Sequence, residues 1–211
     1  MTFGFGYDSF TDNYKVLVVL RGVIQDSSGN FVCKIEVKVH ASNTNDWKKI
    51  QGYPFGFLVL EKSGEFVSGK INWLASIDFE ENSSRFIVSF DLEEETYQKI
   101  LLPDNGGVNV LALGVLKDCL CVTSGDDVWV MKEYGNKDSW TKLFTLSSEV
   151  DRSISHVFAK EVYFFEDDQV FMKLMGSFNL FYYDSRNGTI KYTNFDTILG
   201  VSIESLISPS S

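Results

Sequence analysis

The two histidines are the residues best suited to proton transfer at neutral pH, and neither lies in a catalytic pattern. His40 is on the polar side of an alternating segment, and His156 stands between Ser155 and Val157 with no acid nearby in sequence. The chain has no Gly-X-Ser-X-Gly motif, phosphate-binding loop or His-Glu-X-X-His motif. A serine or cysteine nucleophile would need one of these histidines as its base. We therefore expect no catalytic residue and no cofactor.

The three cysteines could hold a metal ion only as part of a larger ligand set. Cys119 and Cys121 are two residues apart, so both thiols lie on one face of a strand. A structural zinc site needs about four ligands, which would require Cys33 and a distant histidine as well. We interpret the cysteines as small core residues and predict no metal site. Their odd number and the lack of a signal peptide predict a cytoplasmic and/or nuclear location.

Clusters of carboxylates are the other groups that could carry chemistry. They occur at Glu80–Glu81, Glu93–Glu95, Asp126–Asp127 and Glu166–Asp168. Paired carboxyl groups are the catalytic groups of glycosidases, and some β-propellers are glycosidases. These runs lie in turn-like segments, where charges are usually solvated. The three adjacent carboxylates of Glu166–Asp168 also lack the alternating spacing of a calcium loop. If the fold is a β-propeller, an enzyme such as a glycosidase is therefore an alternative function.

Charge and composition exclude several partners. The formal net charge is −10, which disfavours binding to nucleic acids and to anionic membranes. The chain contains no run of about 18 apolar residues, the length that a transmembrane helix requires. The chain is 44% hydrophobic and 15% aromatic, so it can bury a substantial core.

The elements that would position any functional residue recur along the chain. Four similar segments start at positions 47, 97, 140 and 190, at intervals of 50, 43 and 50 residues: Trp47–Ile50, Tyr97–Ile100, Trp140–Leu143 and Ile190–Thr193. A second set of similar segments is centred on Ile71, Leu120 and Val162, at intervals of 49 and 42 residues. These intervals are typical of four-stranded propeller blades of roughly 40–50 residues.

No segment has a convincing helical period, so the sequence predicts an all-β fold of short antiparallel strands. The repeats indicate about four blades within a single domain over residues 1–211. Their approximate limits are 3–50, 55–103, 108–146 and 154–196.

Individual segments predict how the strands pack. In Tyr14–Leu20 the side chains of both alternating sets, one on each face of the strand, are mostly apolar. This pattern is expected of a strand covered on both faces. Ile35–His40 alternates, with its apolar side chains facing inward, and Gln25–Asn30 between the two is a turn in which Gly29 can adopt positive φ. Recurrent aromatic residues are expected to pack between sheets: Trp47, Trp73, Tyr97 and Trp140.

The start of the chain resembles a known family. Gly6–Asp8 and Asp12–Val16 are similar to the opening Gly-Tyr-Asp and Asp-Asp-Tyr-Lys-Val of the F-box-associated, kelch-like propeller region of plant F-box proteins, with Asn13 replacing one Asp. The resemblance continues in order over nearly the whole chain, at Val37–Ile50, Val67–Ala75, Ile87–Leu92, Leu102–Pro103, Leu113–Val122, Val128–Gly135, Ser139–Phe144, Tyr183–Asp184 and Glu204–Pro209. Ser68 and Asn72 depart from the family's usual Asn and His.

The resemblance implies a partial kelch-like β-propeller that binds proteins. In such proteins an N-terminal F-box binds a Skp-type adaptor on a cullin ubiquitin ligase, and the propeller selects a target for ubiquitination. No F-box precedes Phe3, so we expect a truncated form that cannot recruit the ligase. A remnant that binds targets without ubiquitination is a further alternative. The target and the loops that bind it stay unknown.

A partial propeller would leave sheet edges open. Val201–Ile207 alternates like a strand whose partner is missing, and we expect the chain to associate through unpaired edges. Tyr53–Phe57 has the aromatic density of a contact loop, although we interpret it as buried.

Overall fold

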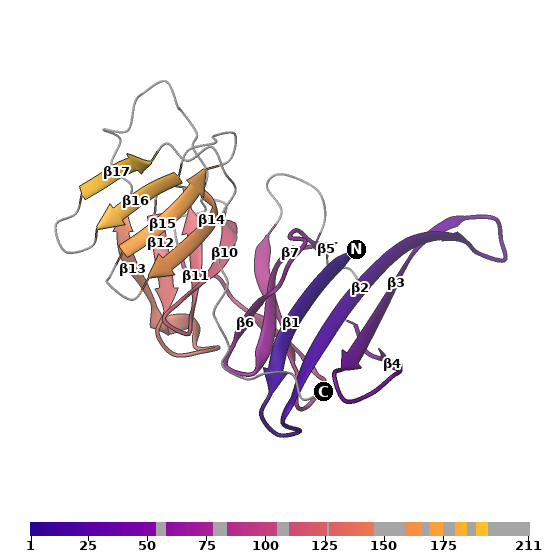
Figure 1. The fold of residues 1–211 in the computed structure, drawn as a ribbon. Helices are drawn as coiled ribbons and strands as arrows, with labels where there is room; N and C mark the ends of the chain where they lie inside the picture. The colour runs from indigo at the N-terminus through magenta and orange to yellow at the C-terminus, as the bar shows by residue number, and fades with distance from the viewer. Residues whose placement is uncertain are drawn as a thin grey trace.

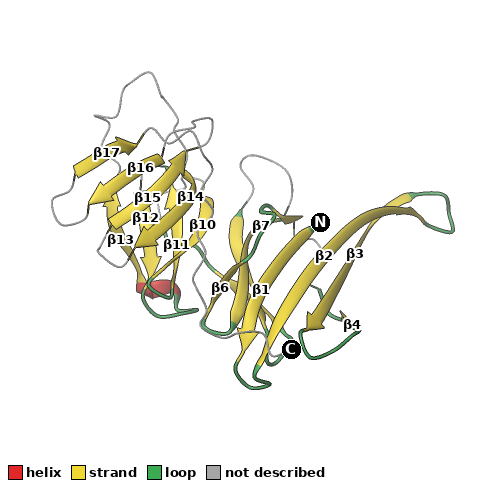
Figure 2. Ribbon diagram, in the orientation of Figure 1, coloured by secondary structure: helices red, strands yellow, loops and turns green. Residues whose placement is uncertain are grey.

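The computed structural model confirms the all-β class. It describes residues 1–53, 58–77, 84–104, 110–125, 127–145, 159–165, 169–174, 180–184 and 189–193. The described residues form strands, short turns and one 3-10 turn at Lys137–Ser139, with no α-helix among them (Figure 2). Within these residues no helix is long and apolar enough to cross a membrane.

Sheet 1 contains the first four strands in chain order: β1 (Thr2–Asp8), β2 (Asn13–Gln25), β3 (Phe31–Ala41) and β4 (Trp47–Ile50). All neighbouring strands are antiparallel. The predicted turn between β2 and β3 is present, and Gly29 has a φ of +86° there. The two strands continue past the sheet as a projecting hairpin (Figure 1), on which Val23 is 69% and Phe31 is 78% exposed.

The two faces of sheet 1 differ in burial. The face toward sheet 2 is closed by Leu17, Val19, Val37 and Val39. The other face carries the alternate residues of Tyr14–Leu20, which stay partly exposed. The prediction that this strand is covered on both faces is therefore wrong for the described structure, because no described sheet packs on its outer side. Ile35–His40 alternates as predicted.

Sheet 2 follows the same plan, with a divided first strand. Its strands are β5 (Leu58–Val59) and β6 (Glu65–Val67), which both pair with β7 (Lys70–Ser76), then β8 (Arg85–Asp91) and β9 (Tyr97–Ile100). A tight turn with positive φ at Ser68 (51°) and Gly69 (75°) joins β6 to β7. Residues of both alternating sets of β7 are buried, so this sheet is covered on both faces.

The remaining strands form two further four-stranded antiparallel sheets. Sheet 3 contains β10 (Val110–Leu116), β11 (Cys119–Ser124), β12 (Asp127–Met131) and β13 (Trp140–Thr145). Sheet 4 contains β14 (Ala159–Phe165), β15 (Gln169–Leu174), β16 (Leu180–Asp184) and β17 (Thr189–Thr193). The four sheets match the four predicted repeats.

The first strands of neighbouring sheets lie side by side (Figure 1). Between sheets 1 and 2, the Phe3 N–H donates to the Lys62 carbonyl at 2.9 Å, and the Gly64 N–H donates to the Phe3 carbonyl at 2.8 Å. Similarly, β10 lies beside both β6 and β14. Such a row of inner strands is typical of blades around a propeller axis.

The two repeat patterns differ in how well they predict the strands. The segments that start at 47, 97, 140 and 190 each belong to the last strand of a sheet, so they occupy equivalent positions in the four sheets. The second set is only partly equivalent. Ile71 and Leu120 lie in second strands, whereas Val162 lies in β14, the first strand of sheet 4. The predicted equivalence of Val162 is wrong.

Two clusters of apolar side chains fill the spaces between the first three sheets. The cluster between sheets 1 and 2 includes Leu17, Val37, Ile71, Trp73 and Phe90. The cluster between sheets 2 and 3 includes Leu74, Ile87, Ile100, Leu120, Met131 and Trp140. Burial of these side chains supplies the main force that holds the sheets together.

Three of the four recurrent aromatic residues pack between sheets as predicted. Trp73 and Trp140 are buried, and Tyr97 packs edge-on against Tyr53 with ring centroids 5.6 Å apart. The prediction for Trp47 is wrong, because its side chain is 49% exposed. The strand register places Trp47 opposite His40 on the outer face of sheet 1, and the two rings lie 5.2 Å apart there.

Close packing requires glycine at two positions around the interface of sheets 1 and 2. A Cβ at Gly4 of sheet 1 would lie 2.3 Å from Cγ2 of Ile71 in sheet 2, and one at Gly64, just before β6, would lie 2.4 Å from Cε2 of Trp73 within sheet 2. Neither distance is possible without moving the core.

Candidate interaction site

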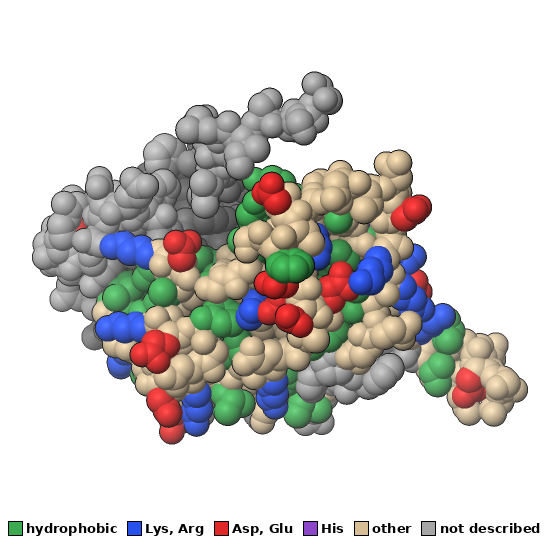
Figure 3. Space-filling view, turned by 90° about the horizontal axis from the view of Figure 1, so that it is seen from below, with side chains coloured by type: hydrophobic (Ala, Val, Ile, Leu, Met, Phe, Trp, Pro, Cys, Tyr) green, Lys and Arg blue, Asp and Glu red, His purple; other side chains and the backbone are tan. Residues whose placement is uncertain are grey.

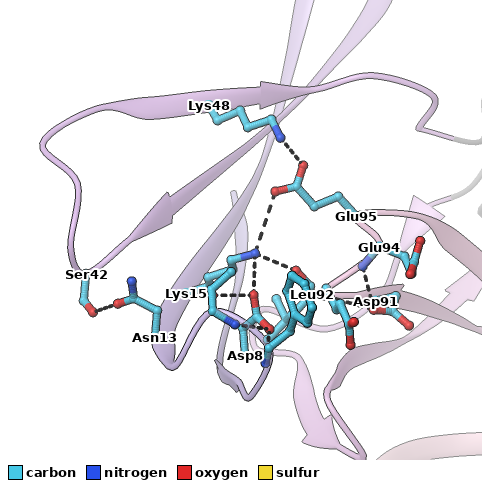
Figure 4. A network of polar contacts seen from close by, with 12 residues as sticks. Asp8, Asn13, Lys15, Ser42, Lys48, Asp91, Leu92, Glu94 and Glu95 are labelled. Carbon is cyan, nitrogen blue, oxygen red and sulfur yellow. Dashed lines mark hydrogen bonds and ion pairs between the residues drawn. The ribbon is translucent and has the colours of Figure 1, made fainter.

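A buried ion pair lies where sheets 1 and 2 meet (Figure 4). Lys15 Nζ is 2.8 Å from Asp8 Oδ2, and it also donates to the Leu92 carbonyl of sheet 2 at 2.6 Å. Asp8 and Lys15 belong to the two opening motifs, Gly6–Asp8 and Asp12–Val16. The register of β1 on β2 brings these motifs together around one short turn. Lys15 thus links sheet 1 to the residue that follows β8 of sheet 2, and Asp8 holds Lys15 in place.

The carboxylate of Asp8 is satisfied on every side. The Phe10 N–H donates to Oδ1 at 3.0 Å, and the Thr11 hydroxyl donates to Oδ2 at 2.7 Å. Burial acts to raise the pKa of Asp8, but the hydrogen bonds from Lys15 and Thr11 outweigh it, so this pKa lies below its usual value. Asp8 is thus ionised and fixed.

Glu95 extends this network toward the surface. Its carboxylate lies 3.8 Å from Lys15 Nζ and forms an ion pair with Lys48 of β4 (Figure 4). Nearby, Asp91 pairs with Lys70, and its Oδ1 accepts the N–H groups of Glu93 at 2.9 Å and Glu94 at 3.0 Å. These contacts fix the turn that leads into β9.

A groove lies beside this network, between the segment that follows β4 and strand β9. Its volume is about 450 Å³, and it is lined by Gln51, Gly52, Val88, Glu95, Thr96, Tyr97, Gln98 and Lys99. Most of these side chains are polar, and five are consecutive along the turn before β9 and β9 itself. Five of the lining residues thus come from one continuous stretch of chain at the edge of sheet 2.

A second exposed feature is the outer face of sheet 1. Phe3 is 45% exposed and Phe5 is 54% exposed, and the Phe5 ring stacks on Tyr14 at 5.3 Å. The register places Phe3 opposite Val18 and Phe5 opposite Val16, so the apolar groups are contiguous. Figure 3 shows hydrophobic side chains interspersed with charged ones on the face of the molecule seen from below.

A partly buried carboxylate, that of Glu61, joins sheets 2 and 3 near the inner strands. Oε2 of Glu61 accepts the Leu74 N–H at 3.2 Å, and Oε1 accepts the Leu113 N–H at 3.0 Å. Burial raises the pKa of Glu61 to about 7, although both N–H groups act against this, and Glu65 contributes a further small rise. Burial also raises the pKa of Glu65. Neither carboxylate lines the groove.

The residues singled out for chemistry do not converge. His40 packs on Trp47, Cys119 is partly buried and Cys121 is fully buried, which raises the pKa of its thiol. The described residues contain no group of three or more His, Cys, Asp or Glu side chains suited to a metal ion. Several sequence predictions fall outside the described structure: His156, the side chain of Cys33, Glu80–Glu81, Asp126, Glu166–Asp168, residues 54–57 and Val201–Ile207.

Among the acidic runs, the described members have structural contacts. Asp127 pairs with Lys142 at 3.0 Å, and Glu95 belongs to the network described above, while Glu93 and Glu94 are exposed. Sequence reasoning did not identify the groove or Glu61. An isolated glutamate in a segment between two strands gives no sign that its carboxylate will bond to the main chain of two sheets.

Comparison with known proteins places the chain in a family. Residues 1–197 match the family model of the F-box associated beta propeller domain. An F-box/kelch-repeat protein of Arabidopsis thaliana is 29% identical over 100% of this chain and 57% of its own length. F-box protein CPR1 of the same plant is 33% identical over 68% of this chain and 40% of its own length. Another Arabidopsis F-box protein is 32% identical, over 73% and 42% respectively.

These matched regions span about half the length of the relatives. Among solved structures, virginiamycin B lyase of Staphylococcus aureus has a TM-score of 0.46 at 9% identity, over 90% of this chain and 83% of that one. The family match extends over all four sheets. The chain therefore belongs to the F-box associated β-propeller family.

Proposed function

We propose that this chain is the target-binding module of an F-box protein, holding a protein for ubiquitination by an SCF-type cullin ligase. The observation that carries the proposal is the family match over residues 1–197, together with three relatives that are F-box proteins. In this proposal a Skp-type adaptor is bound by an F-box, and the propeller supplies the selectivity for the target. The fixed ionic junction at Asp8 and Lys15 would hold two blades rigidly while the exposed surfaces bind.

The exposed surfaces fit protein binding better than catalysis. The outer face of sheet 1 presents aromatic side chains to solvent, and aromatic residues are enriched in protein interfaces. A glycosidase would need two carboxyl groups about 5–10 Å apart on either side of its substrate. Glu95 is the only carboxylate that lines the described groove, and it is engaged by Lys48 and Lys15.

A tethering experiment tests the proposal. The F-box of CPR1 is joined to the N-terminus of this chain, the fusion is purified from plant cells with the proteasome inhibited, and co-purifying proteins are identified by mass spectrometry. Purified adaptor, cullin and ubiquitin-transfer enzymes are then added. We expect at least one co-purifying protein to be ubiquitinated, and only when the F-box is present.

The same F-box joined to an unrelated β-propeller is the control. If both fusions retain the same proteins, or if no retained protein is ubiquitinated, the proposed function is contradicted.

A further inference from the structure

The outer strand of sheet 2, β9, directs main-chain groups away from its sheet. The Asp91 N–H donates to the Thr96 carbonyl at 2.9 Å, which identifies a hydrogen-bonded pair between β8 and the turn before β9. Such pairs alternate with non-hydrogen-bonded pairs along an antiparallel ladder. Gln98 therefore bonds to β8, whereas the N–H and C=O groups of Tyr97 and Lys99 point outward.

The next residue of the outward set confirms this alternation. Leu101 is two positions beyond Lys99, and its carbonyl accepts the indole N–H of Trp140 at 2.9 Å. Sheet 3 thus covers the edge of β9 at Leu101. Among the described residues, none pairs with the outward main-chain groups of Tyr97 or Lys99.

The groove of about 450 Å³ lies along this same edge. Gln51 and Gly52, which follow β4, line it together with Val88 of β8. A volume of this size is within the range of about 300–1,000 Å³ that is usual for ligand sites. An extended segment beside β9 could therefore bond to the strand and place a side chain in the groove.

The charge of Lys99 indicates which side chain would fit. Lys99 Nζ lies 4.3 Å from the centre of the Phe86 ring, and no described carboxylate forms an ion pair with it. Glu95 also lines the groove, but Lys48 and Lys15 neutralise it. Lys99, one of the residues that line the groove, is therefore a cation without a carboxylate partner among the described residues, and is complementary to an acidic side chain.

We propose that an extended segment of the target protein adds to sheet 2 as a strand along β9, with an acidic side chain directed at Lys99. This inference rests on the proposed target-binding function and specifies how one class of target is held. Main-chain hydrogen bonds to Tyr97 and Lys99 would supply affinity, and the groove would supply selectivity.

A purely protective function is the competing explanation. Short outer strands with a lysine also prevent sheets from pairing with other chains. That explanation predicts that no peptide binds to this edge, so the two can be separated by experiment.

The probe is a phage-displayed library of random dodecapeptides, selected on the whole 211-residue chain. The test variant is Lys99→Pro, which removes the outward N–H but no bond to β8. Proline is tolerated at an edge position whose N–H faces solvent. Lys99→Gln is the matched control, since it removes the charge and keeps the N–H.

We expect wild type to enrich peptides that carry an acidic residue. Their affinity should fall about tenfold or more in Lys99→Pro and about two- to fivefold in Lys99→Gln, with thermal midpoints close to that of wild type. Absence of enrichment, or equal affinity for wild type and Lys99→Pro, would overturn the proposal.

Amide hydrogen exchange provides a second readout that does not depend on a variant. In the free protein, the amides of Gln98 and Ile100 should be protected, and those of Tyr97 and Lys99 should exchange fast. A selected peptide should protect Tyr97 and Lys99. If bound peptide leaves these two amides unprotected, the strand-addition geometry is wrong.

The outcomes separate this inference from the proposed function. If the tethered Lys99→Pro fusion still retains and ubiquitinates its target, the strand-addition inference fails and target binding stands. If the wild-type fusion retains no target, the proposed function fails, whatever the peptide library shows.

Discussion

The phenol of Tyr134 in sheet 3 donates to the amide oxygen of Asn72 in sheet 2 at 2.6 Å. Asn72 is fully buried, and its amide N–H groups donate to the carbonyls of Glu65 at 3.1 Å and Lys70 at 3.2 Å. The hydroxyl of Ser89 lies 2.6 Å from the same phenol. Asn72 occupies the position where the family pattern has His, so in this chain an amide joins the two blades.

Tyr134→Phe should destabilise the protein by about 1–3 kcal/mol, because it leaves the buried amide oxygen of Asn72 without its donor. The free energy of unfolding from urea denaturation measures this. Tyr7→Phe is the control, since the Tyr7 hydroxyl binds Asp12 at an exposed position and its loss should change stability by about 0.5 kcal/mol or less. Equal effects of the two substitutions would show that the hydrogen bond from Tyr134 to Asn72 does not stabilise the contact between sheets 2 and 3.

Trp140→Ala should destabilise by about 3–5 kcal/mol, because the side chain is buried between sheets 2 and 3 and its N–H bonds to Leu101. Trp47→Ala should have a much smaller effect, about 1 kcal/mol or less, because Trp47 is half-exposed. Thermal and chemical denaturation of both variants measure the contrast. A thermal midpoint of Trp140→Ala within error of wild type would show that the assignment is wrong.

Lys15→Gln should destabilise by about 3–5 kcal/mol, because Asp8 would remain buried without its cation. Restoring neutrality with the double variant Asp8→Asn/Lys15→Gln should recover part of this loss. A double-mutant cycle gives the interaction energy directly. Additive effects would show that the ion pair does not couple the two positions.

Glu61 should make stability depend on pH. Its pKa in the folded protein is raised from 4.5 to about 7, so the folded state favours the protonated form. The resulting stabilisation is full below about pH 4.5 and is lost as the pH rises through about 7. Between pH 5 and pH 8, wild type should lose about 2–3 kcal/mol more than Glu61→Gln.

The slope against pH is the informative quantity in that comparison, since glutamine also changes the hydrogen bonds to Leu74 and Leu113. Glu65 has a raised pKa as well and should leave a residual slope in the variant. Parallel stability curves for wild type and Glu61→Gln would show that the pKa of Glu61 is not raised in the folded protein.

The outer face of sheet 1 should promote association of the isolated chain, because Phe3 and Phe5 expose contiguous apolar surface. Size-exclusion chromatography with light scattering should show species larger than 23.9 kDa. Phe5→Ser should shift the distribution toward monomer. A monodisperse monomer for wild type would show that the outer face of sheet 1 does not promote association.

Local patterns in the sequence predicted the strands well. They predicted poorly which side chains are covered by other sheets or contact residues far away in the sequence. The segments that begin at Trp47, Tyr97 and Trp140 were correctly interpreted as equivalent strands, because their residue types and spacing repeat. The burial of Trp47 was predicted wrongly, because a strand pattern does not show whether another sheet covers its outer face. Glu61 was missed because its carboxylate bonds to Leu113, 52 residues away.

The central claim is that this domain binds a target protein by itself. Isothermal titration of the target from the tethering experiment into the isolated 211-residue chain tests this most directly. We expect saturable binding with defined stoichiometry and with an affinity equal to that of the fusion that carries the F-box. No heat of binding to the isolated chain, with binding retained by the fusion, would contradict it.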